Sequence, residues 1–319
     1  MWLQTAAKRT EAVKRLKARF RIVATGTPVE NRLSELWSIF DFLNPGLLGS
    51  SGTFAERLTA DGKATAELKR LVAPFILRRL KSEVLTDLPP KTEITLPVEL
   101  GPKERTAYEA CRIHALESLK GSEENRISIL AELMRLRRFC CHPSLVLKDM
   151  RESAKLDALR DLLTDLRAAD HRALVFSQFT DYLAIVRRLI EENGWTCQYL
   201  DGATPTKARG EAVAAFQRGE GDFFLISLKA GGMGLNLTAA NYVILLDPWW
   251  NPAVENQAAD RVHRIGQKNP VTIYRLIAAN TVEERVLELH AEKKAIAADI
   301  LDGTGKSALT PEALMKLFG

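Results

Sequence analysis

Two arginines near the end of the chain have the spacing of a phosphate-binding pair. Residues 257–267 read Gln-Ala-Ala-Asp-Arg-Val-His-Arg-Ile-Gly-Gln, which places Arg261 and Arg264 three positions apart. On a helix, residues at this spacing project from the same face. Two guanidinium groups held together can bind the oxygens of a nucleotide phosphate, and an arginine that reaches a transferring phosphoryl group stabilises its transition state. The segment alone leaves an alternative open, in which these arginines pair with Asp260 and Glu255 in a solvated basic turn.

A glycine-rich segment is the second candidate for phosphate binding. Residues 231–234 read Gly-Gly-Met-Gly, which lets backbone N–H groups approach a phosphate closely, and Lys229 adds a positive charge. No Lys-Ser or Lys-Thr follows the last glycine, so this is not a Walker A loop, and a tight strand-to-helix turn is the alternative. Residues 303–307, Gly-Thr-Gly-Lys-Ser, resemble the end of a Walker A motif, but Ile300 replaces its first glycine. We expect that segment to be a flexible tail.

Strands alternating with helices after residue 155 would bring these groups to one edge of a parallel sheet. The strand-like runs are 173–176, 197–200, 223–227, 242–246 and 272–277, and the helices between them cover about 181–193, 205–218 and 253–264. This alternation is typical of βαβ units with helices on both faces of the sheet. Ligands of open α/β sheets bind beyond the carboxyl ends of the strands, and polar or glycine-rich residues follow four of these runs. The pattern predicts a binding face there.

The first half of the chain shows a different order of elements. The periodicity predicts a basic helix over 1–20, a short buried strand at 21–25, a helix from 33 to Asn44-Pro45-Gly46, a helical region at 54–82, a strand at 92–100 and a helical region at 103–140. Pro97 favours an edge position for the strand at 92–100, because proline cannot donate a ladder hydrogen bond. A last helix, about 282–301, precedes a polar tail.

Composition limits the class of protein. The 319 residues are enough for about two domains. A net charge of +5 is compatible with a polyanionic partner. Four cysteines without a CxxC pair indicate a reduced, intracellular protein, which we expect to be cytoplasmic and nucleoid-associated, or nuclear. No apolar run reaches the roughly 18 residues of a membrane span, so no membrane partner is expected.

Six segments, in order along the chain, resemble motifs of the Swi/Snf-type DNA translocases, which are superfamily-two helicase-like ATPases. They are Thr25–Trp37 (motif III), Leu77–Lys81 with Leu88–Lys91 (the inter-lobe segment), Phe176–Phe179 (motif IV), Leu200–Thr204 (the motif after it), Ser227–Asn236 (motif V) and Gln257–Gln267 (motif VI). The resemblance covers nearly the whole chain. The ending His-Arg-Ile-Gly-Gln distinguishes this family from the DEAD-box RNA helicases.

The resemblance implies an α/β fold with two RecA-like lobes, ATP in the cleft between them and double-stranded DNA across both. This chain would hold a RecA-like parallel sheet with flanking helices, which is the second helicase lobe, together with helical insertions and a remnant of the first lobe. The implied boundaries are a first-lobe remnant at 1–53, a helical insertion and inter-lobe linker at 54–91, the second lobe at 92–301 with an insertion at about 103–150, and a tail at 302–319.

The resemblance also implies roles for individual residues. Arg261 and Arg264 would be arginine fingers that complete the ATP site. The remaining implied contacts are Gly234, Asn236 and Gln257 with ATP, and Ser177, Gln178, Gly202, Thr204, Lys229, Gly231 and Trp250 with DNA, while Thr25, Gly26 and Thr27 would couple the two sites. His263 is expected to be structural. Phosphate contacts dominate such DNA binding, which should be sensitive to salt and blind to sequence.

One departure from the family matters for activity. The family's phosphate-binding loop and its Asp-Glu magnesium box precede motif III, and this chain contains neither. We therefore expect ATP with Mg²⁺ to bind only when a first lobe is supplied in cis or in trans, and the chain alone to be an inactive monomer without a metal site. The first-lobe remnant should expose apolar surface. The alternatives are a non-catalytic module that binds DNA or a protein partner and, with less support, a generic α/β ligand-binding protein.

Overall fold

The chain divides into two compact units. A computed structural model describes residues 8–24, 33–54, 67–68, 70–77, 79, 85, 88–120, 126–231, 235–250, 252–289 and 314–318. The first unit comprises Met1–Leu80 with Ala291–Leu309, and the second comprises Lys81–His290 with Thr310–Gly319. The segment Thr25–Arg32, which carries most of the motif III resemblance, lies outside the described residues.

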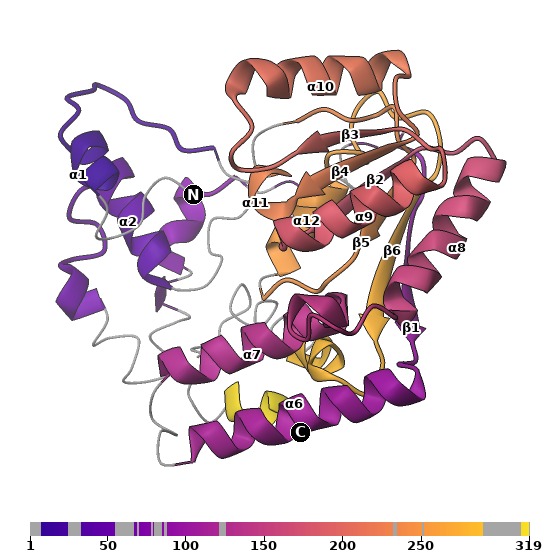
Figure 1. Ribbon diagram of the computed structural model, residues 1–319. Helices are drawn as coiled ribbons and strands as arrows, with labels where there is room; N and C mark the ends of the chain where they lie inside the picture. Colours follow the sequence, from indigo (N-terminus) through magenta and orange to yellow (C-terminus); the bar gives the residue numbers. More distant parts are fainter. Residues whose placement is uncertain are drawn as a thin grey trace. The chain divides into compact units, whose positions relative to one another are not determined.

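A six-stranded sheet forms the centre of the second unit (Figure 1). Its strands are β1 (Lys91–Val98), β2 (Ala173–Ser177), β3 (Cys197–Leu200), β4 (Phe223–Ser227), β5 (Tyr242–Leu245) and β6 (Val271–Ala278). The order is β1-β6-β5-β2-β4-β3, and every neighbouring pair is parallel. The predicted parallel α/β sheet is confirmed. Pro97 lies in β1, which is an edge strand as predicted.

Helices cover both faces of this sheet, so all residues of β2 and β4 are buried. Side chains alternate between the faces, because successive residues of a strand point in opposite directions. Leu174 and Phe176 pack with α10 (Thr206–Arg218), α11 (Leu228–Gly231) and α12 (Pro252–Ala259). Ala173 and Val175 pack with α8 (Ala154–Ala168) and α9 (Thr180–Glu192) on the opposite face.

A helical insertion connects β1 to β2. The predicted helical region at 103–140 consists of two helices, α6 (Pro102–Leu119) and α7 (Arg126–Cys141), followed by η2 (Pro143–Leu145). The rings of Tyr108 and Phe139 pack 5.8 Å apart between α6 and α7. The hydroxyl of Tyr108 accepts a 2.8 Å hydrogen bond from the backbone N–H of Val282, where a helix at 282–289 begins. None of the described helices is long and apolar enough to cross a membrane.

The end of the chain differs from the polar tail expected for it. Residues Lys316–Phe318 form the 3-10 helix η3, in which Leu317 and Phe318 are buried. The Arg112 guanidinium on α6 donates a 3.0 Å hydrogen bond to the carbonyl of Phe318. Burial of these apolar side chains attaches the chain end to the insertion. The glycine-rich segment at 303–307 lies outside the described residues.

The described part of the first unit is mostly helical. It contains α1 (Lys8–Lys14), α2 (Leu33–Leu43), a turn of helix at 51–54, helical residues at 67–68 and 70–72, and η1 (Ala73–Phe75). A small core joins α2 to the segments after it through Leu36, Phe40, Leu48, Phe54 and Val72.

Two expectations for the start of the chain need correction. The described helix there is only α1, and residues 15–20 are not helical. Residues 21–24 form no strand, because no described segment provides the ladder of backbone hydrogen bonds that a strand requires. The expected exposed apolar surface is present at Leu16, Phe20 and Ile22, of which Phe20 is 78% exposed.

Candidate functional site

The carboxyl ends of the parallel strands form the candidate site. Ser177, Leu200 and Ser227 are the last residues of β2, β3 and β4, which are neighbours in the sheet. The segments with the motif resemblances follow at these positions, so the fold brings motifs IV and V and the motif between them to one edge. This grouping is what the sequence pattern predicts.

The arginine pair does not lie on a helix, which corrects the geometry expected from its spacing. Helix α12 ends at Ala259, and residues 260–266 form turns and bends. The carbonyl of Arg261 accepts a 3.1 Å hydrogen bond from the N–H of Leu237. Gln267 donates through its amide to the carbonyl of Ala240 at 2.8 Å. These hydrogen bonds with a neighbouring loop stabilise the turn conformation of the segment, so α12 does not continue through it.

The two arginines of this turn have different environments. Arg264 is exposed, whereas Arg261 is half-buried and its Nε is a buried atom with no hydrogen-bond partner in the described structure. Burial lowers the pKa of Arg261, the positive charge of Arg264 lowers it further, and Asp260 acts in the opposite direction. The two cations therefore lie close enough to repel each other. An anion bound between them would relieve this repulsion.

The alternative partner Glu255 is not available to these arginines. Its Oε1 accepts a 2.7 Å hydrogen bond from the N–H of Trp249, and its Oε2 accepts from Nε of Arg275 at 3.0 Å. Burial raises the pKa of Glu255, while these hydrogen bonds and the charge of Arg275 lower it in part. Glu255 thus fixes the start of the loop after β5 to strand β6.

The predicted ATP contacts are only partly described. Asn236 is exposed, and Gln257 is half-buried on α12, one helical turn before Arg261. Gly234 lies outside the described residues, as do Thr25, Gly26 and Thr27. The structure therefore places Gln257 near the arginine turn and does not describe the four positions Gly234, Thr25, Gly26 and Thr27.

The loop after β3 has a rigid hydrogen-bonded conformation. The Oδ1 of Asp201 accepts from the N–H groups of Ala203 and Thr204 at 2.9 and 3.0 Å. The Arg209 guanidinium donates to the carbonyls of Thr204 and Asp201 at 2.7 and 2.9 Å. Gly202 is exposed at the loop tip with open space around it, because a Cβ added to this glycine would have no atom within 4 Å. Gly202 and Thr204 are therefore presented on a fixed loop.

Motif V is described up to the end of α11. Lys229 is exposed on this short helix, and Gly231 is its last residue. Lys229 thus has the exposure that a phosphate contact requires.

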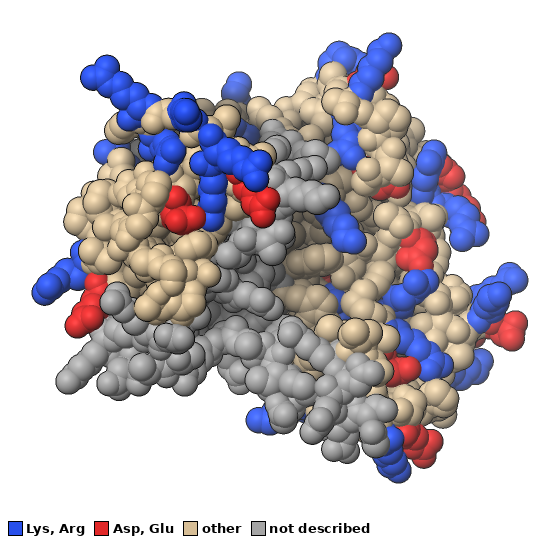
Figure 2. All heavy atoms as spheres, turned by 90° about the vertical axis from the view of Figure 1, so that its left-hand side faces the viewer, with Lys and Arg blue, Asp and Glu red and all other residues tan. Residues whose placement is uncertain are grey.

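Figure 2 shows a face of the molecule on which Lys and Arg side chains project in several groups, with fewer Asp and Glu among them. That face agrees with the net positive charge of the sequence.

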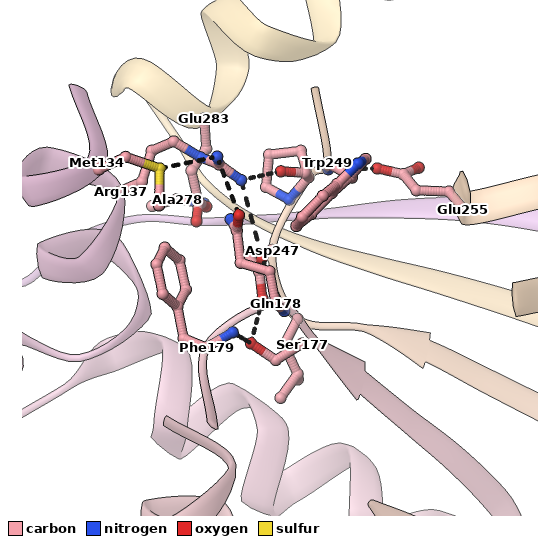
Figure 3. A network of polar contacts seen from close by, with 12 residues as sticks. Met134, Arg137, Ser177, Gln178, Phe179, Asp247, Trp249, Glu255, Ala278 and Glu283 are labelled. Carbon is pink, nitrogen blue, oxygen red and sulfur yellow. Dashed lines mark hydrogen bonds and ion pairs between the residues drawn. The ribbon is translucent and has the colours of Figure 1, made fainter. Parts of the chain in front are cut away.

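A buried polar network lies beneath the loops after β2 and β5 (Figure 3). The Ser177 hydroxyl donates to Oδ1 of Asp247, and the N–H of Gln178 lies 3.3 Å from both oxygens of the same carboxylate. Arg137 on α7 places Nη2 3.8 Å from Oδ2 of Asp247. The guanidinium also lies over the ring of Trp250, with Cζ 4.8 Å from the ring centroid.

This network changes how some predicted DNA contacts are interpreted. Ser177 is completely buried, and its hydroxyl is used inside the protein, so its contact with DNA stays a prediction. Gln178 and Trp250 are half-buried beside it and remain candidates. Burial raises the pKa of Asp247, while Arg137, Ser177 and the backbone of Gln178 lower it in part.

Sequence reasoning missed the role of Arg137. It is one of many basic residues in the insertion, and nothing in its local sequence distinguishes a buried arginine from a solvated one. Asp247 had a stronger signal, because it directly follows the run 242–246 at a predicted strand end. In the described part of the chain, no three His, Cys, Asp or Glu side chains gather as they would to hold a metal ion.

The fold and the ordered motifs define a class of protein, a RecA-like lobe of a helicase-like ATPase. Residues 3–145 match the family model of the SNF2-related domain, and residues 154–266 match that of the helicase conserved C-terminal domain. The chain belongs to the Swi/Snf-type family of superfamily-two helicase-like proteins.

Individual relatives agree with this assignment. The chain is 39% identical over 330 residues to a putative ATP-dependent helicase/translocase of Bacillus subtilis, covering 98% of this chain and 36% of that protein. It is also 39% identical over 315 residues to an uncharacterized ATP-dependent helicase of Mycoplasma pneumoniae, covering 97% of this chain and 31% of the relative. The chain thus spans about a third of the length of these curated relatives.

A solved structure is similar in both fold and sequence. The Sulfolobus solfataricus SWI2/SNF2 ATPase core in complex with double-stranded DNA matches with a TM-score of 0.58 and 35% identity. The match covers 92% of this chain and 65% of that chain.

Proposed function

We propose that this chain supplies the second lobe of an ATP-dependent double-stranded DNA translocase, with Arg261 and Arg264 as its arginine fingers. The observation that carries the proposal is the half-buried guanidinium of Arg261, whose Nε has no described hydrogen-bond partner and which Arg264 repels. Such a pair is prepared for an anion, and a γ-phosphoryl group in transfer is the anion that members of this family process. Gln257 on the preceding helix, with Gly234 and Asn236, would contribute nucleotide contacts.

Duplex DNA would lie along the loops at the carboxyl ends of β2, β3 and β4. We assign Lys229, with Gly202 and Thr204 on their fixed loop, to contacts with the phosphate backbone, together with Gly231 from the motif resemblance. Ser177, whose buried hydroxyl bonds Asp247, would shape the loop that makes these contacts. Gln178 and Trp250 complete this track. The similar Sulfolobus core was solved with double-stranded DNA, which supports this partner. Contacts of this kind carry no sequence information, because every base pair presents the same backbone.

Hydrolysis of ATP would need groups that these 319 residues do not contain. The described residues fit the arginine side of an ATP site, but they offer neither a phosphate-binding loop nor carboxylates gathered around a magnesium ion. When bound, Mg²⁺ would neutralise the negative charge that develops on the transferring phosphates. We infer that a first lobe, in cis or in trans, has to supply these groups and that Thr25, Gly26 and Thr27 link it to the DNA site.

The central experiment is an ATPase assay with duplex DNA, on the chain alone and mixed with a polypeptide that carries the family's first lobe. We expect negligible turnover alone and DNA-stimulated turnover in the mixture. Arg264→Ala should reduce that turnover by about 10³-fold, as loss of an arginine finger does. Robust turnover of the chain alone, lost in Arg264→Ala, would contradict the requirement for a first lobe.

DNA binding is tested separately by fluorescence anisotropy across a salt series. We expect affinity to fall steeply with salt and Lys229→Ala to reduce the slope by about one counterion. Arg218→Ala is the matched control, because Arg218 is the last residue of α10 and lies toward the amino ends of the strands, away from the proposed DNA track. Its side chain pairs with Glu220. Salt-sensitive DNA binding with no turnover in any mixture would instead support the non-catalytic DNA-binding module.

A further inference from the structure

We propose that Arg137 is a positioning residue that fixes the side-chain amide of Gln178 and the ring of Trp250 for contact with the DNA backbone. The inference rests on the proposed function, because it deepens the role of the loops after β2 and β5. Arg137 comes from α7, in the helical insertion, and lies 41 positions before Gln178 and 111 before Pro248. The insertion thereby takes part in shaping the DNA site.

The geometry around Arg137 joins both loops through one guanidinium. The side chain of Arg137 is 0% exposed. Its Nη1 donates to Oε1 of Gln178 at 3.3 Å, and its Nη2 donates to the carbonyl of Pro248. The central carbon of the guanidinium, Cζ, lies over the ring of Trp250, 4.8 Å from the ring centroid. Figure 3 shows the guanidinium of Arg137 facing Asp247 and Gln178.

The chemistry of the guanidinium decides which way the amide of Gln178 faces. Arginine carries only donors, so the group opposite Nη1 has to be the amide oxygen. The amide nitrogen, Nε2, is then on the other side of the group. That nitrogen is buried and has no hydrogen-bond partner in the described structure. A phosphate oxygen is an acceptor and would satisfy this donor once DNA binding uncovers the nitrogen, which is buried in the free chain.

The charge of Arg137 lowers the pKa of the buried Asp247 carboxylate, but neutralisation alone does not explain where the hydrogen bonds of Arg137 go. The carboxylate accepts from the hydroxyl of Ser177 and the N–H of Gln178, while Nη2 of Arg137 is 3.8 Å away, longer than a hydrogen bond. The hydrogen bonds of Arg137 that lie closer go to Gln178 and Pro248. These two contacts define where the loops sit.

Two kinds of variant separate positioning from bulk stability. Gln178→Met removes the donor, and Gln178→Glu keeps an oxygen for Arg137 while replacing the nitrogen by a second oxygen. The pair Arg137→Met with Asp247→Asn removes the guanidinium without leaving a buried charge unpaired. Arg105→Met is the matched control, because Arg105 lies on α6 of the same insertion and donates to the carbonyls of Ala279 and Asn280.

Anisotropy with a labelled DNA duplex gives the first readout. Loss of a hydrogen bond to a charged phosphate should weaken binding about tenfold or more in Gln178→Met, Gln178→Glu and the Arg137–Asp247 double variant. Arg105→Met should bind as the unaltered chain does. Arg137→Lys, which keeps a cationic donor without the planar fork of the guanidinium, should lose less affinity. Unchanged affinity in the folded double variant would overturn the inference.

Acrylamide quenching of Trp250 gives a readout that does not depend on DNA. The contribution of Trp250 is the difference between a protein and its Trp250→Phe derivative, since the chain has five tryptophans. The ring of Trp250 should become more accessible to acrylamide in the Arg137–Asp247 double variant. Its quenching should stay unchanged in Arg105→Met. If the unaltered chain fails to bind DNA, the proposed function is wrong and so is the DNA part of this inference. Unchanged quenching of Trp250 would independently refute the positioning.

Discussion

Nε2 of His263 lies 2.8 Å from the carbonyl oxygen of Pro89, although 174 positions separate the two residues. A carbonyl only accepts, so Nε2 carries the proton and donates. His263 stands between Arg261 and Arg264, and Pro89 belongs to the segment that resembles the inter-lobe linker. The hydrogen bond therefore attaches the linker to the arginine turn, which supports a structural role for His263.

Removing this donor should loosen the linker. We expect His263→Phe to lower the free energy of unfolding by about 1 kcal/mol, the usual net contribution of one hydrogen bond. His263→Gln retains an N–H donor and should lose less. Urea unfolding followed by circular dichroism measures both. Equal losses in the two variants would mean that ring packing matters and that the hydrogen bond to Pro89 does not.

The two arginines should differ in their effect on stability. Arg264 is exposed, so Arg264→Met should change the free energy of unfolding by no more than about 0.5 kcal/mol. Arg261→Met should be neutral or stabilising, because burial and the charge of Arg264 both disfavour its charged form.

Both substitutions should nevertheless reduce the turnover of the reconstituted ATPase by about 10³-fold. The measurement compares urea midpoints and steady-state ATPase rates on the same preparations. If Arg261→Met lowers the free energy of unfolding by more than about 2 kcal/mol, the guanidinium stabilises the turn and is not a strained catalytic group.

Much of the second unit can be predicted from local sequence. The run 197–200 coincides with β3 and 223–227 with β4, because short apolar segments between turn residues have few other stable conformations. The edge position of β1 follows from Pro97. The parallel direction follows from the helices between the strands, which also place the motif segments at one edge.

The details of the site depend on contacts that local sequence does not encode. The arginine turn forms because Leu237 donates to the carbonyl of Arg261, a partner distant in sequence. Arg137 and Asp247 meet only after the insertion has packed on the sheet, and each alone resembles a solvated charge. Long-range pairing of this kind overrides the spacing rule that predicts a helix at 253–264.

Acid should destabilise the protein partly through Glu93. Burial alone would raise the pKa of Glu93, but the hydrogen bond from Lys91 and the charge of Arg275 lower it to about 2 from an ordinary 4.5. Lys91 Nζ and Arg275 Nη1 lie 2.7 and 3.0 Å from its oxygens. Between these two pKa values the folded state binds fewer protons than the unfolded state, so stability rises with pH.

The contribution of Glu93 should therefore be lost as pH falls from about 4.5 to 2. As pH falls across this window, the free energy of unfolding of the unaltered chain should decrease by on the order of 2 kcal/mol more than that of Glu93→Gln. This figure allows for solvent screening. Urea midpoints measured at a series of pH values give the difference, which should stay constant from roughly pH 6 to 8. Parallel curves throughout would show that Glu93 is not held in this way.

Two glycines of the α10 region should respond to alanine with opposite signs. Gly210 lies inside α10 with no atom within 4 Å of an added Cβ, so Gly210→Ala should stabilise the protein by about 0.5–1 kcal/mol. Gly219 ends the helix with a φ of +101°, and an added Cβ would lie 2.7 Å from Nη2 of Arg172. Gly219→Ala should destabilise by about 1–3 kcal/mol, because the left-handed conformation strains any side chain. Urea unfolding of the two variants provides the comparison, and a destabilising Gly210→Ala would mean that the exposed face of α10 is constrained by something other than helix propensity.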